Sequence, residues 1–322
     1  MLSEFDLIAR YFTRAPHDAA RVPLAVGDDC ALLAPTPGRQ LAISTDMLVE
    51  NRHFFAGADP FQLGHKSLAV NLSDLAAMGA RPLAFTLALS LPQADPAWLE
   101  PFARGLLALA DAHQCALIGG DTTKGPLNIC ITVFGEVEPG RALRRDRAQA
   151  GDDIWVSGTL GDARLALAAC RKEIVLDAQN FARAAARLHA PTPRLALGQA
   201  LAGIAHAALD VSDGLAGDLG HILERSGCGA TLDVDALPAG PVLAAQPTSL
   251  RRRFALAGGD DYELCFTAAP ADREQILAAA QACATPVTRI GHIDMQPGLR
   301  LTDANGALLD LDHASFDHFA TP

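Results

Sequence analysis

Aspartates recur beside glycines and hydroxyl residues at the ends of apolar runs in this sequence. The segments that carry them are 26–29, 43–46, 71–74, 118–121, 210–214 and 258–261. Clustered carboxylates repel one another unless a cation lies between them, and in cytosolic enzymes that cation is most often Mg²⁺ holding a phosphate chain. The spacing therefore predicts metal-dependent phosphate chemistry.

Placement along the chain strengthens this prediction, because any one of these segments alone is typical of a turn or a helix cap. Asp29, Asp46 and Asp121 fall at or near the ends of expected strands, where ligand-binding residues gather in open α/β sheets. Asp74 falls in an expected helix near its apolar face. A buried acid there costs several kcal/mol unless a cation or a donor meets it, so Asp74 requires a partner.

The segment 210–214 is the sharpest of these motifs. An apolar run leads into Asp210, and a helical pattern follows Gly214. An N-cap role would explain either Ser212 or Asp213, but it would not explain both aspartates and the serine together. Three further aspartates beside glycines, Asp152, Asp162 and Asp218, are expected to be turn or surface residues.

Other known phosphate-transfer and nucleophile motifs are missing. The sequence has no G-x-x-x-x-G-K-[ST] loop, no protein-kinase motif set and no G-x-S-x-G or Cys-His arrangement. Lys124 and Arg145 are the best candidates for fixed cations near the acidic segments. A polyphosphate would then be neutralised mainly by metal ions, and in-line transfer without a covalent step fits this composition.

Apolar periodicity and breaks in it outline the elements that must position these residues. Helices are expected at 1–14, 60–80, 97–113, 161–172, 194–208, 213–226 and 271–283. Strands are expected at 24–33, 40–48, 82–91, 115–118, 127–137, 153–157, 229–234, 261–268, 287–294 and 298–303. Strands and helices mix without a strict βαβ rhythm, and 138–152 breaks the periodicity. We expect two α/β or α+β domains, at 1–138 and 150–322.

Composition excludes several classes of protein. The 322 residues carry a formal net charge of -11, and no broad basic stretch suggests nucleic-acid binding. No apolar run approaches the ~20 residues that span a bilayer. The start of the chain lacks a secretory apolar core, so a cytoplasmic location is expected. Seven scattered cysteines form no C-x-x-C pair, which argues against zinc and disulfides.

Six segments together resemble the thiamine-monophosphate kinase family: 26–31, 44–46, 71–80, 118–122, 210–215 and 258–264. The motifs follow the family order from residue 4 to residue 319, and 316–322 resembles the enterobacterial type. The resemblance implies transfer of the γ-phosphoryl group of ATP to thiamine monophosphate, which gives thiamine diphosphate and ADP. It also implies an aminoimidazole ribonucleotide synthetase-like fold, with an ATP- and Mg²⁺-binding N-terminal domain that pairs with a second copy in a shared β-barrel.

The resemblance also assigns roles to individual residues. The positions that correspond to the family's magnesium ligands, for several ions bridged by Asp74, are Asp29, Ser44, Thr45, Asp46, Asp74, Asp121, Asp210 and Asp213. Those that correspond to ATP contacts are Gly120, Asp121, Arg145 and Ser212. Those that correspond to thiamine phosphate contacts are His53, Asp260 and Phe316. No residue corresponds to a general base, and none is needed because the acceptor phosphate is already ionised at neutral pH.

Two of these positions depart from the common pattern. Asp260 stands where glutamate is frequent, and Phe316 stands where a tyrosine can occur. Stacking on an aromatic thiamine ring survives the second change, but a phenolic hydrogen bond does not.

Two other classes of function remain as alternatives. Another ATP-dependent synthetase of the same superfamily would use a reactive cysteine, either near the N-terminus or as the last residue, and no cysteine precedes Cys30 or follows Cys283. A non-catalytic protein would bind Mg²⁺ and nucleotide without turnover, and the acceptor-side residues argue against it.

Overall fold

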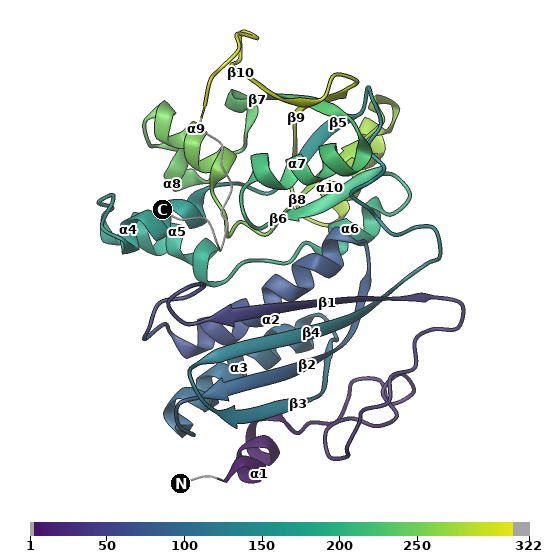
Figure 1. Ribbon diagram of the computed structural model, residues 1–322, viewed down its shortest axis with the longest axis vertical. Coiled ribbons are helices and arrows are strands. Elements are labelled where there is room, and N and C mark those ends of the chain that lie inside the picture. Colours follow the sequence, from purple (N-terminus) through teal and green to yellow (C-terminus); the bar gives the residue numbers. More distant parts are fainter. Residues whose placement is uncertain (1–2, 312–322) are drawn as a thin grey trace. The chain divides into compact units, whose positions relative to one another are not determined.

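The structure is a computed structural model that describes residues 3–311, and Figure 1 shows the course of the chain from purple to yellow. The chain divides into two compact units. The N-terminal unit comprises the residues up to Leu75 together with Ala80–Gly140, and the C-terminal unit comprises Ala76–Gly79 and the chain from Arg141 onward. Both units mix helices and strands, which confirms the expected two-domain α/β architecture.

The N-terminal unit contains four strands, two long helices and a short helical segment at its start. In chain order these are α1 (Glu4–Leu7), η1 (Ile8–Phe12), β1 (Gln40–Val49), α2 (Pro60–Ala77), β2 (Arg81–Leu91), α3 (Pro96–Ala112), β3 (Ala116–Lys124) and β4 (Asn128–Val137).

The strands of this unit form one sheet in the order β1-β4-β2-β3. Strand β4 pairs antiparallel with β1 and β2, and β2 pairs parallel with β3. Figure 1 shows α2 and α3 behind this sheet, on the same face of it. Strand β1 alternates accordingly: Leu41, Ile43, Thr45 and Met47 are exposed, whereas the residues between them are half-buried or buried. One face of the sheet therefore carries the core, and the other is open in a single chain.

The C-terminal unit contains six strands with helices between them. Its elements are β5 (Asp153–Ser157), α4 (Asp162–Cys170), α5 (Ala178–His189), α6 (Leu195–Leu201), β6 (Ala207–Val211), α7 (Leu215–Ser226), β7 (Gly229–Asp233), η2 (Val234–Ala236), α8 (Pro241–Ala244), α9 (Thr248–Ala257), β8 (Glu263–Ala268), η3 (Pro270–Asp272), α10 (Arg273–Ala282), β9 (Val287–Asp294) and β10 (Gly298–Thr302).

The six strands form a sheet in the order β10-β7-β9-β5-β8-β6, in which only the β10–β7 pair is parallel. The strands β5, β6 and β8 are buried on both faces. Ile154 and Val156 of β5 join the main apolar cluster with residues of α4, α5, α7, α8 and α9. Trp155 lies between them on the strand and stacks on Phe266, with ring centroids 6.4 Å apart. A sheet buried on both faces holds the residues at its strand ends firmly in place.

Most expected elements are present, and the exceptions have physical causes. The expected strand 24–33 is wrong: the segment doubles back around Gly27, and it forms two isolated bridges, between Leu24 and Leu32 and between Val26 and Asp28. The expected helix 194–208 ends at Leu201, and a strand begins at Ala207. An apolar run as short as 207–211 fits a buried strand as well as a helix, so periodicity could not separate them. The helices α5 and α9 were not predicted from the pattern of apolar residues.

Among the residues that the structure describes, no helix has the length and apolar character needed to cross a membrane.

Candidate active site

The segment 210–214 forms the turn between β6 and α7. Asp210 is buried at the end of β6, where it pairs with Leu264 of β8. The helix α7 has Gly214 as its N-cap and no side-chain cap, so neither Ser212 nor Asp213 caps it. Instead, one carboxylate oxygen of Asp218 accepts the backbone N–H groups of Ser212, Asp213 and Gly214 at 3.0, 3.1 and 3.1 Å. These three bonds fix the backbone of the turn.

Asp218 is therefore buried and organises the turn, which corrects the expectation that it is a turn or surface residue. Burial raises the pKa of Asp218 to about 6; the neighbouring Asp213 charge acts in the same direction, and the backbone N–H donors oppose it. Asp152 and Asp162 are also buried rather than on the surface. Asp152 accepts hydrogen bonds from Gln149 and Thr267, and Asp162 accepts one from Leu243. These three aspartates hold local structure.

In the N-terminal unit, β1 and α2 bring two of the expected ligands into contact. The Ser44 hydroxyl donates a short hydrogen bond to Asp74 Oδ2, so Asp74 has the donor that its position requires. Asp46 lies on the same face of β1 two residues on, and its N–H donates to Asn71 Oδ1 of α2 at 3.1 Å. Thr45 points to the opposite face, where its hydroxyl is 2.8 Å from that of Thr132. The structure thus groups Ser44, Asp46 and Asp74 but separates the Thr45 side chain from them.

A second group of expected ligands lines a cavity of about 970 Å³ in the same unit. Its walls include Phe5, Phe12, Leu117 and Phe134, and Asp29, Gly120 and Asp121 lie on its rim. Gly120 has φ +146° in β3, and a Cβ atom there would lie 1.8 Å from the Leu87 carbonyl oxygen of β2. Only glycine fits this position. Strand β3 therefore continues through Gly119 and Gly120, which were expected to end it.

The segment 258–263 lies against the turn 210–214. Asp260 N–H donates to the Ser212 carbonyl and Tyr262 N–H donates to the Val211 carbonyl, both at 2.8 Å. Asp260 and Tyr262 have φ +67° and +51°, in the left-handed region that residues other than glycine rarely adopt. This segment therefore holds Asp260 in a strained backbone that surrounding contacts must maintain.

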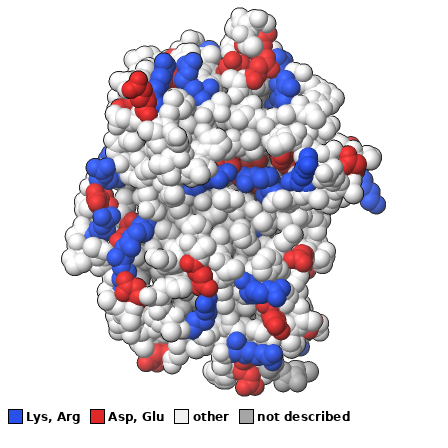
Figure 2. All heavy atoms as spheres, turned by 180° about the vertical axis from the view of Figure 1, so that it is seen from behind, with Lys and Arg blue, Asp and Glu red and all other residues white. Residues whose placement is uncertain are grey.

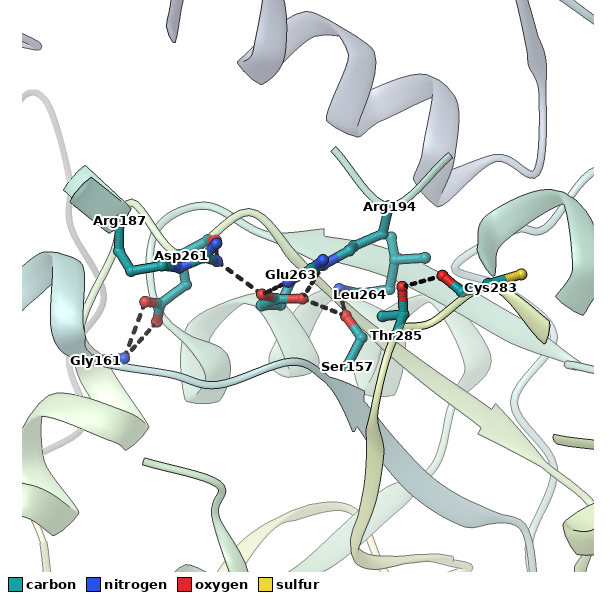
Figure 3. Close-up of polar contacts among 9 residues, drawn as sticks. All are labelled: Ser157, Gly161, Arg187, Arg194, Asp261, Glu263, Leu264, Cys283 and Thr285. Carbon is teal, nitrogen blue, oxygen red and sulfur yellow. Dashed lines mark hydrogen bonds and ion pairs between the residues drawn. The ribbon is translucent and has the colours of Figure 1, made fainter. Parts of the chain in front are cut away.

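Figure 3 shows the polar cluster beside this segment. Glu263 has no exposed surface, and its carboxylate accepts from Arg187 at 2.7 Å, from Arg194 at 2.5 and 2.6 Å, and from Ser157 at 2.6 Å. The buried Asp261 carboxylate accepts the Gly161 N–H at 2.9 Å. Burial raises the pKa of Asp261 well above its usual range, although the Gly161 N–H and Arg187 oppose that rise.

The remaining residues that were expected to contact substrates are His53, Arg145 and Phe316. His53 follows β1, and its Nδ1 accepts the Val49 N–H at 2.9 Å, which places the ring proton of a neutral His53 on Nε2. The Arg145 side chain is exposed, and its carbonyl accepts from Ser226 at 2.9 Å. Phe316 and the ending 316–322 lie outside the described residues.

The donor set suits Mg²⁺. The grouped atoms are carboxylate and hydroxyl oxygens, the hard ligands that this ion prefers. Within residues 3–311, no three side chains of the His, Cys, Asp and Glu types come together as a closed metal site. Mg²⁺ commonly binds through one or two carboxylates and keeps waters or substrate phosphates as its other ligands, so dispersed oxygens of this kind fit it.

Sequence reasoning missed Asp218, Arg187 and Arg194. A local signal existed for the helix of Arg187, since Asp177 precedes an amphipathic run and accepts the Asn180 N–H as its N-cap. No local signal pointed to the pairing of Arg187 and Arg194 with Glu263, because 69 or more residues separate the partners.

Known proteins resemble the chain along nearly its whole length. The family model "AIR synthase related protein, N-terminal domain" matches residues 27–137, and the corresponding C-terminal domain model matches 149–304. The thiamine-monophosphate kinase of Salmonella typhimurium is 46% identical over 322 residues, which cover 99% of each chain.

Solved structures agree with the sequence relatives. A thiamine-monophosphate kinase from Stenotrophomonas maltophilia is 50% identical with a TM-score of 0.83, covering 87% of this chain and 91% of that one. AaThiL complexed with AMPPCP and TMP is 28% identical with a TM-score of 0.77, covering 89% of each chain. These similarities span both units and include the segments that carry the expected ligands. The chain therefore belongs to the thiamine-monophosphate kinases of the AIR synthase related family.

Proposed function

We infer that this chain transfers the γ-phosphoryl group of ATP to the phosphate of thiamine monophosphate, giving thiamine diphosphate and ADP. The observation that carries this inference is the identity with curated thiamine-monophosphate kinases along the full chain. The related kinase in complex with AMPPCP and TMP supports both substrates. Dependence on ATP also supports a cytoplasmic location.

We propose that oxygens within each unit hold several Mg²⁺ ions. In the N-terminal unit the side-chain ligands are Asp29, Ser44, Asp46, Asp74 and Asp121, and in the C-terminal unit they are Asp210 and Asp213. Thr45, whose side chain lies on the opposite face of β1, would contribute through its backbone carbonyl oxygen. When bound, Mg²⁺ neutralises phosphate oxygens and favours in-line transfer. Asp74 is the ligand held most firmly, because the Ser44 hydroxyl fixes its carboxylate.

The nucleotide is proposed to contact Gly120, Asp121, Arg145 and Ser212. The cavity beside Gly120 has the volume of a small-molecule site and largely apolar walls, which suit a nucleobase. Asp218 holds the turn that carries Ser212, because its carboxylate accepts the Ser212 backbone N–H.

Thiamine monophosphate is proposed to contact His53, Asp260 and Phe316. The Val49 N–H fixes His53 Nδ1 as an acceptor, so Nε2–H can donate to a phosphate oxygen. Asp260 can accept a hydrogen bond from the amino group of thiamine or interact by charge with its thiazolium ring. The chain supplies no general base, and the attacking phosphate oxygen needs none.

One assay tests the reaction. With Mg²⁺, ATP and thiamine monophosphate, we expect chromatography to show stoichiometric thiamine diphosphate and ADP. Free thiamine in place of thiamine monophosphate is the matched control and should give no phosphorylated product. A folded protein that forms no thiamine diphosphate, or that hydrolyses ATP equally well without an acceptor, would contradict the proposed function.

We propose further that the protein is a homodimer whose N-terminal sheets pair through their open faces into a β-barrel. Leu41, Ile43 and Met47 of β1 are 43%, 59% and 52% exposed and lie on one face of the strand. Adjacent exposed apolar residues on a sheet face are typical of an interface. A second copy would cover them and complete a closed layer.

The Ile43→Arg substitution tests this interface. A buried arginine facing its own symmetry copy is expected to weaken dimerisation by at least about a hundredfold, which sedimentation velocity over a dilution series would measure. The matched control is Val175→Arg, because Val175 is 94% exposed in the C-terminal unit. A wild-type protein that stays monomeric, or an Ile43→Arg protein that sediments like wild type, would rule out this interface.

We propose no nucleic-acid or membrane partner. On the face that Figure 2 shows, basic and acidic side chains are intermixed in small groups, and neither sign covers a broad area. The net charge of -11 also disfavours binding to a polyanion.

A further inference from the structure

The backbone of Asp260 depends on a contact that its own motif does not supply. Asp260 and Tyr262, on either side of Asp261, both have left-handed φ values, and such residues are maintained only where surrounding contacts hold them. On one side, two hydrogen bonds tie this segment to the turn 210–214. On the other side lies the cluster of Figure 3.

Arg187 of α5 joins that cluster to the strained segment. Its terminal nitrogen donates to Glu263 Oε1 at 2.7 Å and to the Asp261 backbone carbonyl at 3.0 Å. The Asp261 carbonyl belongs to the peptide group that joins Asp261 to Tyr262. Arg187 therefore fixes the orientation of the peptide that precedes Tyr262, one residue after Asp260.

Arg194 donates to the same Glu263 carboxylate but not to the Asp261 carbonyl. Its two nitrogens donate to Glu263 Oε2 and Oε1 at 2.6 and 2.5 Å. Both guanidinium groups are largely buried, so loss of either leaves Glu263 with less compensation for its desolvation. The two arginines thus contribute similarly to stability, and only Arg187 holds the backbone beside Asp260.

From this difference we propose that Arg187 is a positioning residue for thiamine monophosphate. It acts through the Asp261 carbonyl to hold Asp260 where it meets the acceptor substrate. The proposal rests on the proposed function of Asp260. It assigns Arg187 no contact with either substrate.

A comparison of Arg187→Gln with Arg194→Gln tests this positioning role. We expect Arg187→Gln to raise KM for thiamine monophosphate about tenfold, with KM for ATP within about twofold of wild type, because misplacing Asp260 weakens acceptor binding. Arg194→Gln should leave both KM values near wild type despite a similar fall in the melting temperature. Kinetics are measured at low temperature, where circular dichroism shows both variants folded.

Hydrogen exchange supplies a readout that does not depend on turnover. The amides of Asp260 and Tyr262 should exchange faster in Arg187→Gln than in wild type, and at the wild-type rate in Arg194→Gln. If Arg187→Gln does not fold, Arg187→Lys replaces it; lysine keeps the charge, but its side chain is one atom shorter and its ammonium falls short of the Asp261 carbonyl, so the same KM and exchange shifts are expected.

Equal KM changes in the two variants, or unchanged exchange at Asp260 and Tyr262 in Arg187→Gln, would overturn the positioning role. If the wild type does not phosphorylate thiamine monophosphate, the proposed function fails by itself. The exchange comparison then still decides whether Arg187 holds this segment.

Discussion

Replacing Asp74 by asparagine is expected to lower kcat about a hundredfold to a thousandfold while the protein stays folded. Asparagine keeps an oxygen that can accept the Ser44 hydroxyl hydrogen bond, so the contact between α2 and β1 survives. It removes the negative charge that a shared Mg²⁺ ligand must carry. Steady-state kinetics at saturating Mg²⁺ measure the loss, and circular dichroism checks the fold.

Asp111→Asn is the matched control for this substitution. Asp111 also lies in a helix of the N-terminal unit, and it pairs at the surface with Arg14 at 2.9 Å. The Arg14 side chain lowers the pKa of Asp111, so its charge is present at neutral pH as well. Activity near wild type in Asp111→Asn and in Asp74→Asn alike would show that Asp74 is not a metal ligand.

Replacing Gly105 by alanine is expected to destabilise the N-terminal unit by about 3 kcal/mol. A Cβ atom at Gly105 of α3 would lie 1.9 Å from the Phe61 carbonyl oxygen of α2, and one at Gly64 of α2 would lie 2.1 Å from the Phe102 carbonyl oxygen. The two helices therefore cross with their backbones in contact, and any side chain must push them apart. Urea denaturation and the melting temperature measure the effect.

Gly220→Ala in α7 is the control, since a Cβ atom there meets nothing within 4 Å. Alanine should leave stability unchanged or raise it by up to about 1 kcal/mol, because glycine within a helix costs backbone entropy. If Gly105→Ala behaved in the same way, the close crossing of α2 and α3 would not be a constraint on the fold.

Long periodic segments could be predicted from sequence. The expected helix 60–80 and strand 40–48 correspond to α2 and β1, because each carries many repeats of its period. The segment 24–33 could not be assigned correctly. The chain turns back on itself at Gly27, and the segment forms isolated bridges instead of pairing with a neighbouring strand. Propensity describes a segment alone, whereas a strand also needs a partner.

The acidic motifs could be found from sequence, but their supports could not. Asp74 was expected to need a partner, and Ser44 supplies it from a strand 30 residues away. Asp218 looked like a surface residue because its pattern is that of an exposed helical turn, and only the fold of 212–214 over it shows its role. Local spacing points to the candidate ligands. The residues that position those ligands are determined by tertiary contacts, which local spacing does not reveal.

The alternation along β1 limits the mutations that this strand can accumulate during evolution. Ser44 and Asp46 face the helices, while Ile43, Thr45 and Met47 face outward. Deleting or inserting one residue within β1 would move every residue beyond that point to the other face, which would place carboxylates on the apolar side and apolar groups beside Asp74. A substitution alters one side chain, whereas a change in the length of this ten-residue strand alters both faces at once.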